Sequence, residues 1–392
     1  MVSNYICPNC ASAEMTVFHH VERAPIHSVL LLPTYEEAIN YPTGQIALGL
    51  CSTCGFIANT VYDPSHQEYG LRYEGTQSFS STFNVFAYNL ATNLIERYDL
   101  HNKDIIEVGC GQGEFLLQLC ELGENRGVGF DPAYRGDAPE SEAKDRVEFI
   151  ADFYSEKYSN YRGDFVCCKM TMEHIKEPFE FVSTVRRSIG DNFDTVVFFQ
   201  VPNGAYVMRD LAFWDVYYEH CSYFTRGSLT YLFERAGFEV LRVYTGYNSQ
   251  YLMIEAKPCP EAIPAVADPV ELEAVEADVA HFSEALAPKF AEWRNTIAEM
   301  IDRGERIVLW GGGSKGVAFL TTLGIRDEIA YVVDINPRKR GMFMAGLGQE
   351  IVSPEFLKTY QPNTIIVMNP IYCDEIQATL DGMGVAARLI SV

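Results

Sequence analysis

The segment from Asp104 to Phe115 constrains the fold of this chain more than any other. It reads DIIEVGCGQGEF, so a short apolar run is followed by three spaced glycines and then by the start of an amphipathic helix. Glycine lets a backbone approach a ligand closely, and the first turn of a helix presents N–H groups that lack partners. A strand, a glycine turn and a helix in this order predict a ligand-binding turn within an α/β sheet.

An acid at the end of the expected strand narrows the kind of ligand. Glu107 precedes the first glycine, so the turn has the form E-x-G-x-G-x-G. A carboxylate at this place suits an amine-bearing or cationic ligand better than a pyrophosphate. The form resembles motif I of class I S-adenosylmethionine methyltransferases, and the resemblance implies that the turn holds the methionine part of the cofactor. The glycines concerned are Gly109, Gly111 and Gly113.

Two later acids support the same ligand. Asp131 ends the expected strand 126–131 about 20 residues on, where an acid can accept hydrogen bonds from both ribose hydroxyls. Asp152 and Phe153 follow the expected strand 147–150. In the methyltransferase resemblance, this pair supplies an acid to the adenine amine and an aromatic ring to its face. S-adenosyl-L-methionine is therefore the predicted cofactor.

Length and composition limit the remaining possibilities. A chain of 392 residues is expected to form two or three domains, and a hydrophobic content of 48% excludes general disorder. A formal net charge of −23 argues against nucleic-acid or anionic-membrane partners. No apolar run approaches the roughly 18 residues of a membrane span, and the first residues do not resemble a signal peptide. We therefore expect a cytoplasmic protein with reduced thiols, either a monomer or a homodimer.

Two C-x2-C pairs near the N-terminus predict a metal site. Each pair forms a tight knuckle that can direct two thiolates at one ion, and four thiolates complete a closed tetrahedral Zn²⁺ site. The alternatives are four ordinary buried cysteines or two redox pairs. Between the pairs, 27–32 and 45–50 are expected to be strands, and 33–40 a short helix or turn. The predicted ligands are Cys7, Cys10, Cys51 and Cys54.

Strands and helices alternate from residue 104 to residue 256 and predict a doubly wound α/β sheet. A region rich in proline follows, and then 270–303 repeats apolar residues at three- and four-residue steps, as one long helix would. We expect this helix to be buried between two domains, although a partner-binding helix is the alternative. The expected domains are a zinc-binding domain at 1–80, a class I methyltransferase domain at 81–257, and the helix with a Rossmann-like domain at 258–392.

Two loops at the carboxyl ends of the expected strands carry acid–base chemistry. One is Met172–His174, and the other is Trp214–Phe224. Histidine accepts protons near neutral pH, a neighbouring carboxylate can orient it, and phenols can donate to an oxyanion. The alternative is that His174 and His220 are structural. A tyrosine-rich stretch at 69–74 is expected to be either a packed connector or a lid over the cofactor.

The C-terminal region contains a second glycine-rich unit. The loop Gly311–Val317 follows a short strand, and Asp334 ends another strand about 20 residues later. A loop of this kind at a helix start can hold an anion, and Lys315 and the cluster 338–340 add positive charge. We interpret the unit as a nucleotide-binding-like domain without its own cofactor, with NAD binding as the alternative.

The order of these regions resembles the S-adenosylmethionine-dependent sugar C-methyltransferases, which methylate C3 of nucleotide-linked 4-keto deoxysugars. The resemblance rests on the four cysteines, the turn after Glu107, the run Tyr217–His220 and the loop 311–316. It implies that this run and His174 line the substrate pocket, and that a histidine is the base. Gln112 departs from the family, which usually has an acid at this position.

The resulting hypothesis is C-methylation beside a ketone on a nucleotide-linked deoxysugar, within secondary metabolism. His220, held by Glu219, would remove a proton, and Tyr217 or His174 would stabilise the enolate. Methylation of oxygen, nitrogen or carbon on a non-sugar intermediate is one alternative, and an NAD-dependent enzyme is another. The residues expected to bind the substrate are Tyr73, Tyr218, Lys315 and Asn203.

Overall fold

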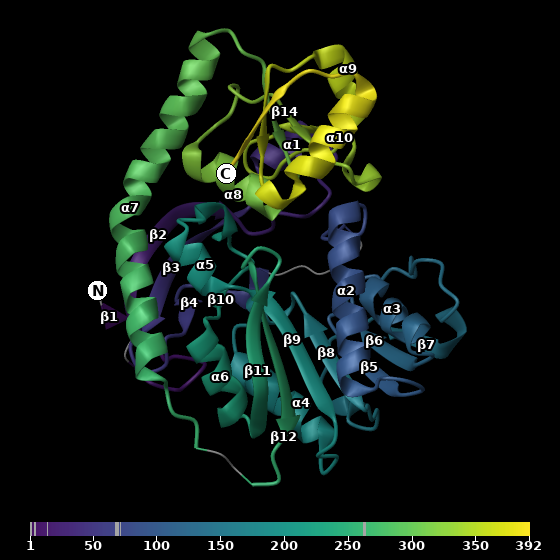
Figure 1. The fold of residues 1–392 in the computed structure, drawn as a ribbon. Coiled ribbons are helices and arrows are strands. Elements are labelled where there is room, and N and C mark those ends of the chain that lie inside the picture. The colour runs from purple at the N-terminus through teal and green to yellow at the C-terminus, as the bar shows by residue number, and fades with distance from the viewer. Residues whose placement is uncertain (1, 4, 14, 67–69, 71, 262–263) are drawn as a thin grey trace.

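Three sheets and one long helix organise the chain, as Figure 1 shows. In this computed structural model the described residues are 2–3, 5–13, 15–66, 70, 72–261 and 264–392. The C-terminal sheet lies above the central sheet in this view, and the N-terminal sheet lies next to the long helix α7. No described helix combines the length and apolar character that crossing a membrane requires.

The central sheet has seven strands in the order β11-β12-β9-β8-β5-β6-β7. Five of them are parallel, while β12 pairs antiparallel with both β9 and β11. Strand order reverses between β5 and β8, and open α/β sheets bind ligands outside the carboxyl ends of strands at such a point. The strands are β5 Asp104–Val108, β6 Arg126–Phe130, β7 Val147–Ile150, β8 Phe165–Lys169, β9 Val196–Pro202, β11 Phe238–Gly246 and β12 Tyr251–Pro258.

Helices cover this sheet, and the predicted alternation of strands and helices is confirmed. Helix α3 begins directly after the glycine turn and buries its apolar face, because Phe115, Leu116 and Leu119 recur at helical spacing. The helices are α2 Ser81–Tyr98, α3 Glu114–Leu122, α4 Pro178–Ile189, α5 Gly204–Arg209 and α6 Arg226–Arg235.

The N-terminal sheet includes a strand from the middle of the chain. Its order is β1-β2-β3-β4-β10, and β10 (Ser222–Tyr223) begins two residues after the predicted acid–base run 217–220 ends. The predicted strand 27–32 is wrong, because this stretch forms only an isolated bridge from Leu30 to Tyr73. The other elements are β1 Val2–Ser3, β2 Met15–Pro25, α1 Tyr35–Ile39, β3 Thr43–Cys51 and β4 Ile57–Asn59.

The C-terminal sheet is parallel throughout, in the order β15-β14-β13-β16-β17, as expected of a Rossmann-like unit. Its strands are β13 Ile307–Trp310, β14 Tyr331–Val333, β15 Glu350–Val352, β16 Thr364–Val367 and β17 Arg388–Ser391. Its helices are α8 Ser314–Leu323, α9 Leu357–Tyr360 and α10 Cys373–Met383.

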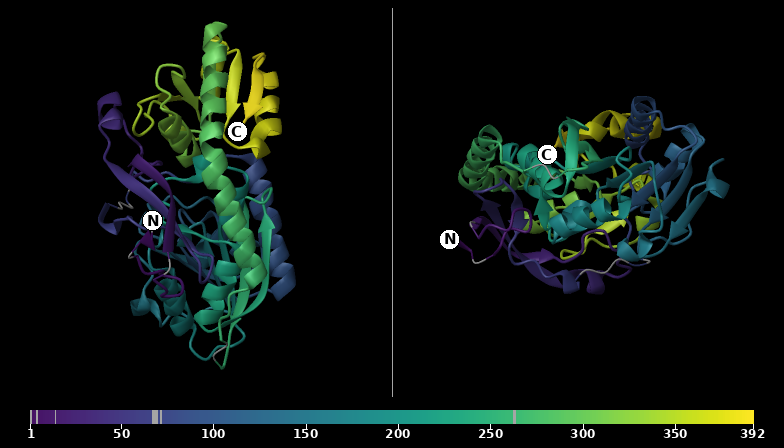
Figure 2. Two further views of the ribbon diagram at one scale, coloured as in Figure 1. Left: turned by 90° about the vertical axis from the view of Figure 1, so that its left-hand side faces the viewer. Right: turned by 90° about the horizontal axis from the view of Figure 1, so that it is seen from below.

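Helix α7 (Pro269–Asp302) runs past both the N-terminal and the C-terminal sheet (Figure 2). Phe282 packs edge-on against Phe18 of β2, with ring centroids 6.3 Å apart. Closer to its end, Trp293 packs edge-on against Phe319 of α8 at 5.2 Å. The prediction of one long helix is confirmed. Only one face of it is buried, and this face packs against both outer sheets, while most of the other residues of the helix are exposed.

Candidate active site

The glycine turn lies at the carboxyl end of β5 and leaves space in front of its middle residue. A Cβ atom at Gly109 would lie 2.0 Å from Oγ1 of Thr171, and one at Gly113 would lie 2.3 Å from the ring of Phe149. At Gly111 the nearest heavy atom would be 3.9 Å away. All three residues have positive φ. The outer glycines are therefore required by packing, whereas Gly111 leaves room for a ligand to approach the backbone.

Asp131, at the end of β6, is tied to this turn. Its carboxylate accepts hydrogen bonds from N–H of Gly111 at 2.8 Å and from N–H of Ala133 at 2.7 Å. Burial raises the pKa of Asp131, which these two hydrogen bonds oppose. A carboxylate oxygen can accept a second hydrogen bond, so the position expected to bind the ribose is compatible with the structure.

Glu107 is buried within the sheet, and its Oε2 has no hydrogen-bond partner. Burial raises the pKa of Glu107 to about 8, against the opposing charge of Lys169 in the neighbouring strand β8. A buried acid without a full set of partners can accept a donor from a ligand, so its position is compatible with the predicted role of Glu107.

Asp152 and Phe153 are the pair predicted to bind adenine, and the side-chain contacts of Asp152 lie outside the glycine turn. Asp152 accepts hydrogen bonds from Lys157 and from the hydroxyl of Tyr158, which hold its pKa at about 2. The side chain of Phe153 is 61% exposed. The aromatic ring that does contact the turn is Phe149, which sequence reasoning missed because it lies inside β7 instead of after it.

A cavity of about 320 Å³ lies where the three parts of the chain meet. Met170 lines it at the end of β8, and the next residue, Thr171, contacts the glycine turn. The cavity and the turn therefore share a wall. Met170 has a φ of +51°, a conformation that is costly for a residue with a side chain and is often found at functional sites. The predicted site residues that line the cavity are Tyr73, His174, Tyr217, His220 and Lys315.

His220 is the centre of the polar groups in this cavity. Its Nε2 lies 2.8 Å from the hydroxyl of Tyr217, and its ring lies edge-on to His174 with centroids 4.9 Å apart. Oε1 of Glu173 is 4.0 Å from the same nitrogen. Burial, then His174 and Lys315, lower the pKa of His220 well below its usual range, so the imidazole is neutral and able to accept a proton.

The prediction that Glu219 holds His220 is wrong. The Glu219 carboxylate faces the N-terminal part of the chain: His27 Nδ1 lies 3.0 Å from it, and Ser28 donates both its backbone N–H and its hydroxyl to it. Glu219 lies in a tight turn that the N–H of His220 closes by donating to the carbonyl of Tyr217 at 3.1 Å, and the contacts of the Glu219 side chain lead away from His220. Sequence adjacency gave the wrong partner.

Two predicted substrate residues are structural instead. Tyr218 packs against Tyr62, and its hydroxyl exchanges hydrogen bonds with the backbone of Asp63. Asn203 caps α5 by accepting from N–H of Ala205, and it donates to the carbonyl of Ser249. Neither side chain is among those that line the cavity.

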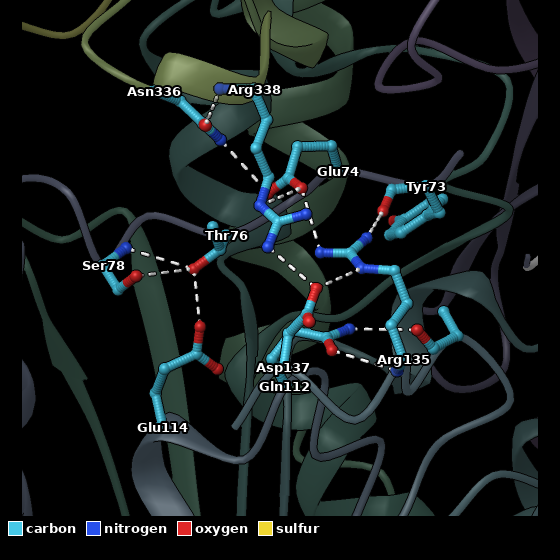
Figure 3. A network of polar contacts seen from close by, with 11 residues as sticks. Tyr73, Glu74, Thr76, Ser78, Gln112, Glu114, Arg135, Asp137, Asn336 and Arg338 are labelled. Carbon is cyan, nitrogen blue, oxygen red and sulfur yellow. Dashed lines mark hydrogen bonds and ion pairs between the residues drawn. The ribbon is translucent and has the colours of Figure 1, made fainter. Parts of the chain in front are cut away.

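Glu74 joins all three parts of the chain beside the cavity (Figure 3). Its buried carboxylate lies 3.0 Å from Arg135 of the central domain, and it accepts a hydrogen bond of 3.1 Å from Asn336 of the C-terminal domain. Nε of Arg338 lies 3.7 Å away. Arg135 also donates to the carbonyl of Tyr73. Residues 69 and 71 of the predicted tyrosine-rich stretch lie outside the described part of the chain.

The residues after Glu74 lie against the glycine turn. The Thr76 hydroxyl donates to Glu114, the first residue of α3, at 2.8 Å, and the Arg135 N–H donates to Gln112 at 3.1 Å (Figure 3). Gly75 and Thr76 also line the cavity. This stretch therefore lies beside both the start of α3 and the cavity, as a lid or pocket wall would, and the Thr76 hydroxyl bonds it to Glu114.

The predicted basic cluster does not converge. Lys339 lines the cavity, but Arg338 turns toward Asp137 at 2.8 Å and Arg340 toward Glu355 at 3.8 Å. The Lys339 ammonium donates to Asp334 and to the carbonyl of Gly312. Consecutive side chains leave this short 3-10 turn in different directions, so charges adjacent in sequence separate in space.

Lys315, by contrast, reaches the cavity from the start of α8. Its ammonium donates to Asp215 at 2.7 Å and to Gln250 at 3.2 Å. Gln250 also forms a reciprocal amide pair with Asn369, with both distances 2.9 Å. Sequence reasoning missed Asp215 and Gln250, because only the packing of the C-terminal domain on the central one brings them to Lys315.

The four predicted metal ligands converge away from the cavity, where β3 ends at Cys51. Their sulfur atoms all lie within 4.8 Å of one another. Asn9 donates to the sulfur of Cys54 at 3.5 Å and to the carbonyl of Ser228 at 3.0 Å. Gly55, after the second knuckle, has a φ of +69°, which explains a glycine there.

The seven-stranded sheet, the glycine turn at its switch point and the acid Asp131 define a class I S-adenosylmethionine-dependent methyltransferase. Comparison with known proteins agrees. Residues 83–243 match the methyltransferase domain family, and residues 267–388 match the family described as C-methyltransferase C-terminal domain. The chain therefore contains one region similar to each of these two families.

One relative spans most of both chains. The C-methyltransferase NovU of Streptomyces niveus is 28% identical over 300 residues, which are 72% of this chain and 70% of NovU. The ribosomal protein L11 methyltransferase of Haemophilus influenzae is 28% identical over 109 residues, 26% of this chain and 36% of the relative.

Solved structures align with the chain only in part. The dimethyltransferase RosA from Streptomyces davawensis has a TM-score of 0.36 at 17% identity, over 45% of this chain and 56% of RosA. The magnesium protoporphyrin IX methyltransferase of Synechocystis PCC 6803, with bound SAH, also scores 0.36, at 15% identity over 45% and 84% of the two chains. Scores this low add nothing to the assignment.

Proposed function

We propose that this protein methylates a carbon beside a ketone, on a nucleotide-linked deoxysugar. The carrying observation is that a neutral, buried His220 and the hydroxyl of Tyr217 face one cavity, which shares a wall with the glycine turn. S-adenosylmethionine, held by Glu107, Asp131 and the turn, supplies an electrophilic methyl group when bound. The relative NovU, a C-methyltransferase, supports transfer to carbon.

The residues of the cavity divide the remaining work. His220 takes a proton from the acceptor carbon, so that the C–H bond breaks and its electron pair remains as an enolate. The hydroxyl of Tyr217 donates a hydrogen bond to the developing oxyanion. Burial raises the pKa of Tyr217, so the phenol keeps its proton. His174 packs against His220 and restricts its ring. The protein otherwise contributes by fixing distance and angle.

Two ammonium groups favour an anionic acceptor. Lys315 and Lys339 line the cavity, and each uses two donors on protein groups. An ammonium carries three donors, so each lysine retains one for a phosphate oxygen. Asp215 and Asp334 offset much of the positive charge of the two lysines. The lysines would therefore recognise a phosphate by the positions of their free donors more than by a net positive charge of the cavity.

The cysteine cluster supports a structural Zn²⁺ ion. Cys7 and Cys54 sulfurs are 3.7 Å apart and Cys10 and Cys51 sulfurs 3.5 Å apart, whereas tetrahedral ligands at about 2.3 Å from zinc lie about 3.8 Å apart. Four thiolates leave no open position for catalysis. Metal analysis should find one zinc per chain, and Cys51→Ser should lose the metal and unfold at lower temperature. A metal-free wild type with unchanged stability would exclude the site.

The proposed reaction is tested with labelled methyl donor. We expect mass spectrometry to show methyl transfer to nucleotide-linked 4-keto-deoxysugars, and deuterium from solvent to enter the acceptor carbon without cofactor. His220→Asn should abolish both, while binding of S-adenosylmethionine is retained. Methylation of oxygen or nitrogen without deuterium entry would instead support the non-sugar alternative, since that chemistry needs no enolate.

A further inference from the structure

One carboxylate in the cavity wall has not been accounted for. Glu173 follows β8 in a short 3-10 turn, is 1% exposed, and neither of its carboxylate oxygens has a hydrogen-bond partner. A buried carboxyl group without partners is costly and is seldom kept without a use. Its backbone is held in place, because the carbonyl of Glu173 accepts from N–H of Cys221 at 3.0 Å. The backbone of Glu173 is therefore held in place, while its carboxylate has no hydrogen-bond partner.

The nearest charged group to Glu173 is the proposed base. Among the ion-pair contacts of the described residues, Glu173 makes one, with Oε1 4.0 Å from Nε2 of His220. Glu173, His174 and His220 offer atoms that all lie within 4.8 Å of one another. Glu219 does not serve in its place, because its carboxylate lies against His27 and Ser28 of the N-terminal part of the chain. Within the described part of the chain, His220 thus has one carboxylate in ion-pair contact, and that carboxylate is not its neighbour in sequence.

We propose that Glu173 in its carboxylate form is the positioning residue of His220, orienting the imidazole and stabilising the imidazolium formed on proton transfer. The inference rests on the proposed function. When the acceptor C–H bond breaks, the proton joins the imidazole of His220 and the electron pair stays on the acceptor, while Glu173 exchanges no proton. Its negative charge beside the new positive charge lowers the cost of the step, more so because the site is shielded from water.

The protonation of Glu173 gives the proposal a measurable signature. Burial raises the pKa of Glu173 to about 8, so the supporting carboxylate forms only on the alkaline side of neutrality. No lysine or arginine contributes to this shift. His174 and His220 lie within 4.8 Å of Glu173, and the charge of Glu173 also acts on Tyr73, Tyr217, Tyr251, Cys168 and Cys221, whose pKa values it raises.

Histidine NMR tests the contact without any acceptor. With ¹³C-labelled histidine, the His220 signal is identified by its loss in His220→Asn. In the wild type we expect this signal to move with a midpoint near pH 8, reporting the ionisation of Glu173. Glu173→Gln should remove the movement. Glu219→Gln is the matched control, and it should keep the movement of His220 while shifting the signal of His27.

Two outcomes would overturn the proposal: a His220 signal that titrates unchanged in Glu173→Gln, or one that loses its titration only in Glu219→Gln. If Glu173→Gln does not fold, Glu173→Asp keeps the charge at a greater distance and should move the midpoint. Once an acceptor is identified, Glu173→Gln should lower kcat at least about tenfold with little change in KM, and remove the rise in rate toward pH 8. Absence of any acceptor would defeat the proposed function and leave the NMR result standing.

Discussion

The molecule contains two glycine-rich units of the same local design. In the central domain, Asp131 accepts from N–H of Gly111 and from N–H two residues after itself, at 2.8 and 2.7 Å. In the C-terminal domain, Asp334 accepts from N–H of Gly312 and from N–H two residues after itself, at 3.0 and 2.8 Å. Strand, loop, helix and second strand follow in the same order in both units.

They differ in what occupies the space beside the acid. Lys339 is 7% exposed and places its ammonium 3.2 Å from Asp334 and 3.1 Å from the carbonyl of Gly312. Among the ion pairs of the described residues, none involves Asp131. At the end of the first strand, Glu107 has Leu309 as its counterpart. The comparison teaches that spacing predicts the hydrogen bonds within such a unit, whereas one distant side chain decides whether the acid remains available to a ligand.

The largest expected effect comes from removing the internal cation. Lys339→Met should lower the free energy of unfolding by about 3 kcal/mol, because Asp334 is then left nearly buried without its partner. Chemical denaturation would measure the change. The double variant Asp334→Asn, Lys339→Met should recover part of the loss. An unchanged stability in the single variant would show that this pair does not distinguish the two units.

A somewhat smaller effect should separate the two acids as cofactor residues. Asp131→Asn should weaken binding of S-adenosylmethionine about 100-fold, through the loss of charged hydrogen bonds to the ribose and of the bond to Gly111. The matched variant Asp334→Asn should leave this affinity within about threefold. Isothermal titration calorimetry measures both, and equal losses would contradict the distinction.

The acid that only the central unit carries should make stability depend on pH. Glu107 has a folded-state pKa of about 8 and a usual value of 4.5, so between these values the folded state keeps a proton that the unfolded state has lost. Stability therefore falls as pH rises through this window. Glu107→Gln should reduce this loss of stability with rising pH. At pH 9 its free energy of unfolding should exceed that of the wild type by at least about 1 kcal/mol. Glu173 leaves a residual slope, since its pKa is raised in the same direction.

The smallest expected signal is a direct one. Titration of the wild type with NAD should give no saturable heat, because the ammonium of Lys339 is paired with Asp334, the acid that would otherwise bind a ribose. Titration with S-adenosylmethionine should give saturable heat. Saturable binding of NAD that Asp334→Asn abolishes would show that the two units are equivalent after all and would revive the NAD alternative.

Much of the fold followed from local patterns. The turn at 109–113, the long helix and the alternating strands obey periodicities and turn chemistry that a few neighbouring residues set. The strand at 27–32 failed because its residues contact Glu219 and Tyr73, which are distant in sequence. For the site, Tyr217, His220 and Lys315 were placed in the cavity, whereas Tyr218 and Asn203 pointed elsewhere. The residue types indicated which chemistry each side chain could perform, but only the packing of the chain determined whether that side chain points into the cavity.

What the sequence determined by itself was the kind of chemistry: an acid before three glycines, paired cysteine knuckles, and imidazoles after two strands. Each of these depends on bonds and sterics within a few residues. Only the tertiary structure decided which side chains contact each other. Glu173 rather than Glu219 faces His220, and Lys339 rather than a ligand meets Asp334. Charges and hydrogen bonds act over a few ångströms of space, and folding, not sequence order, sets which groups come that close.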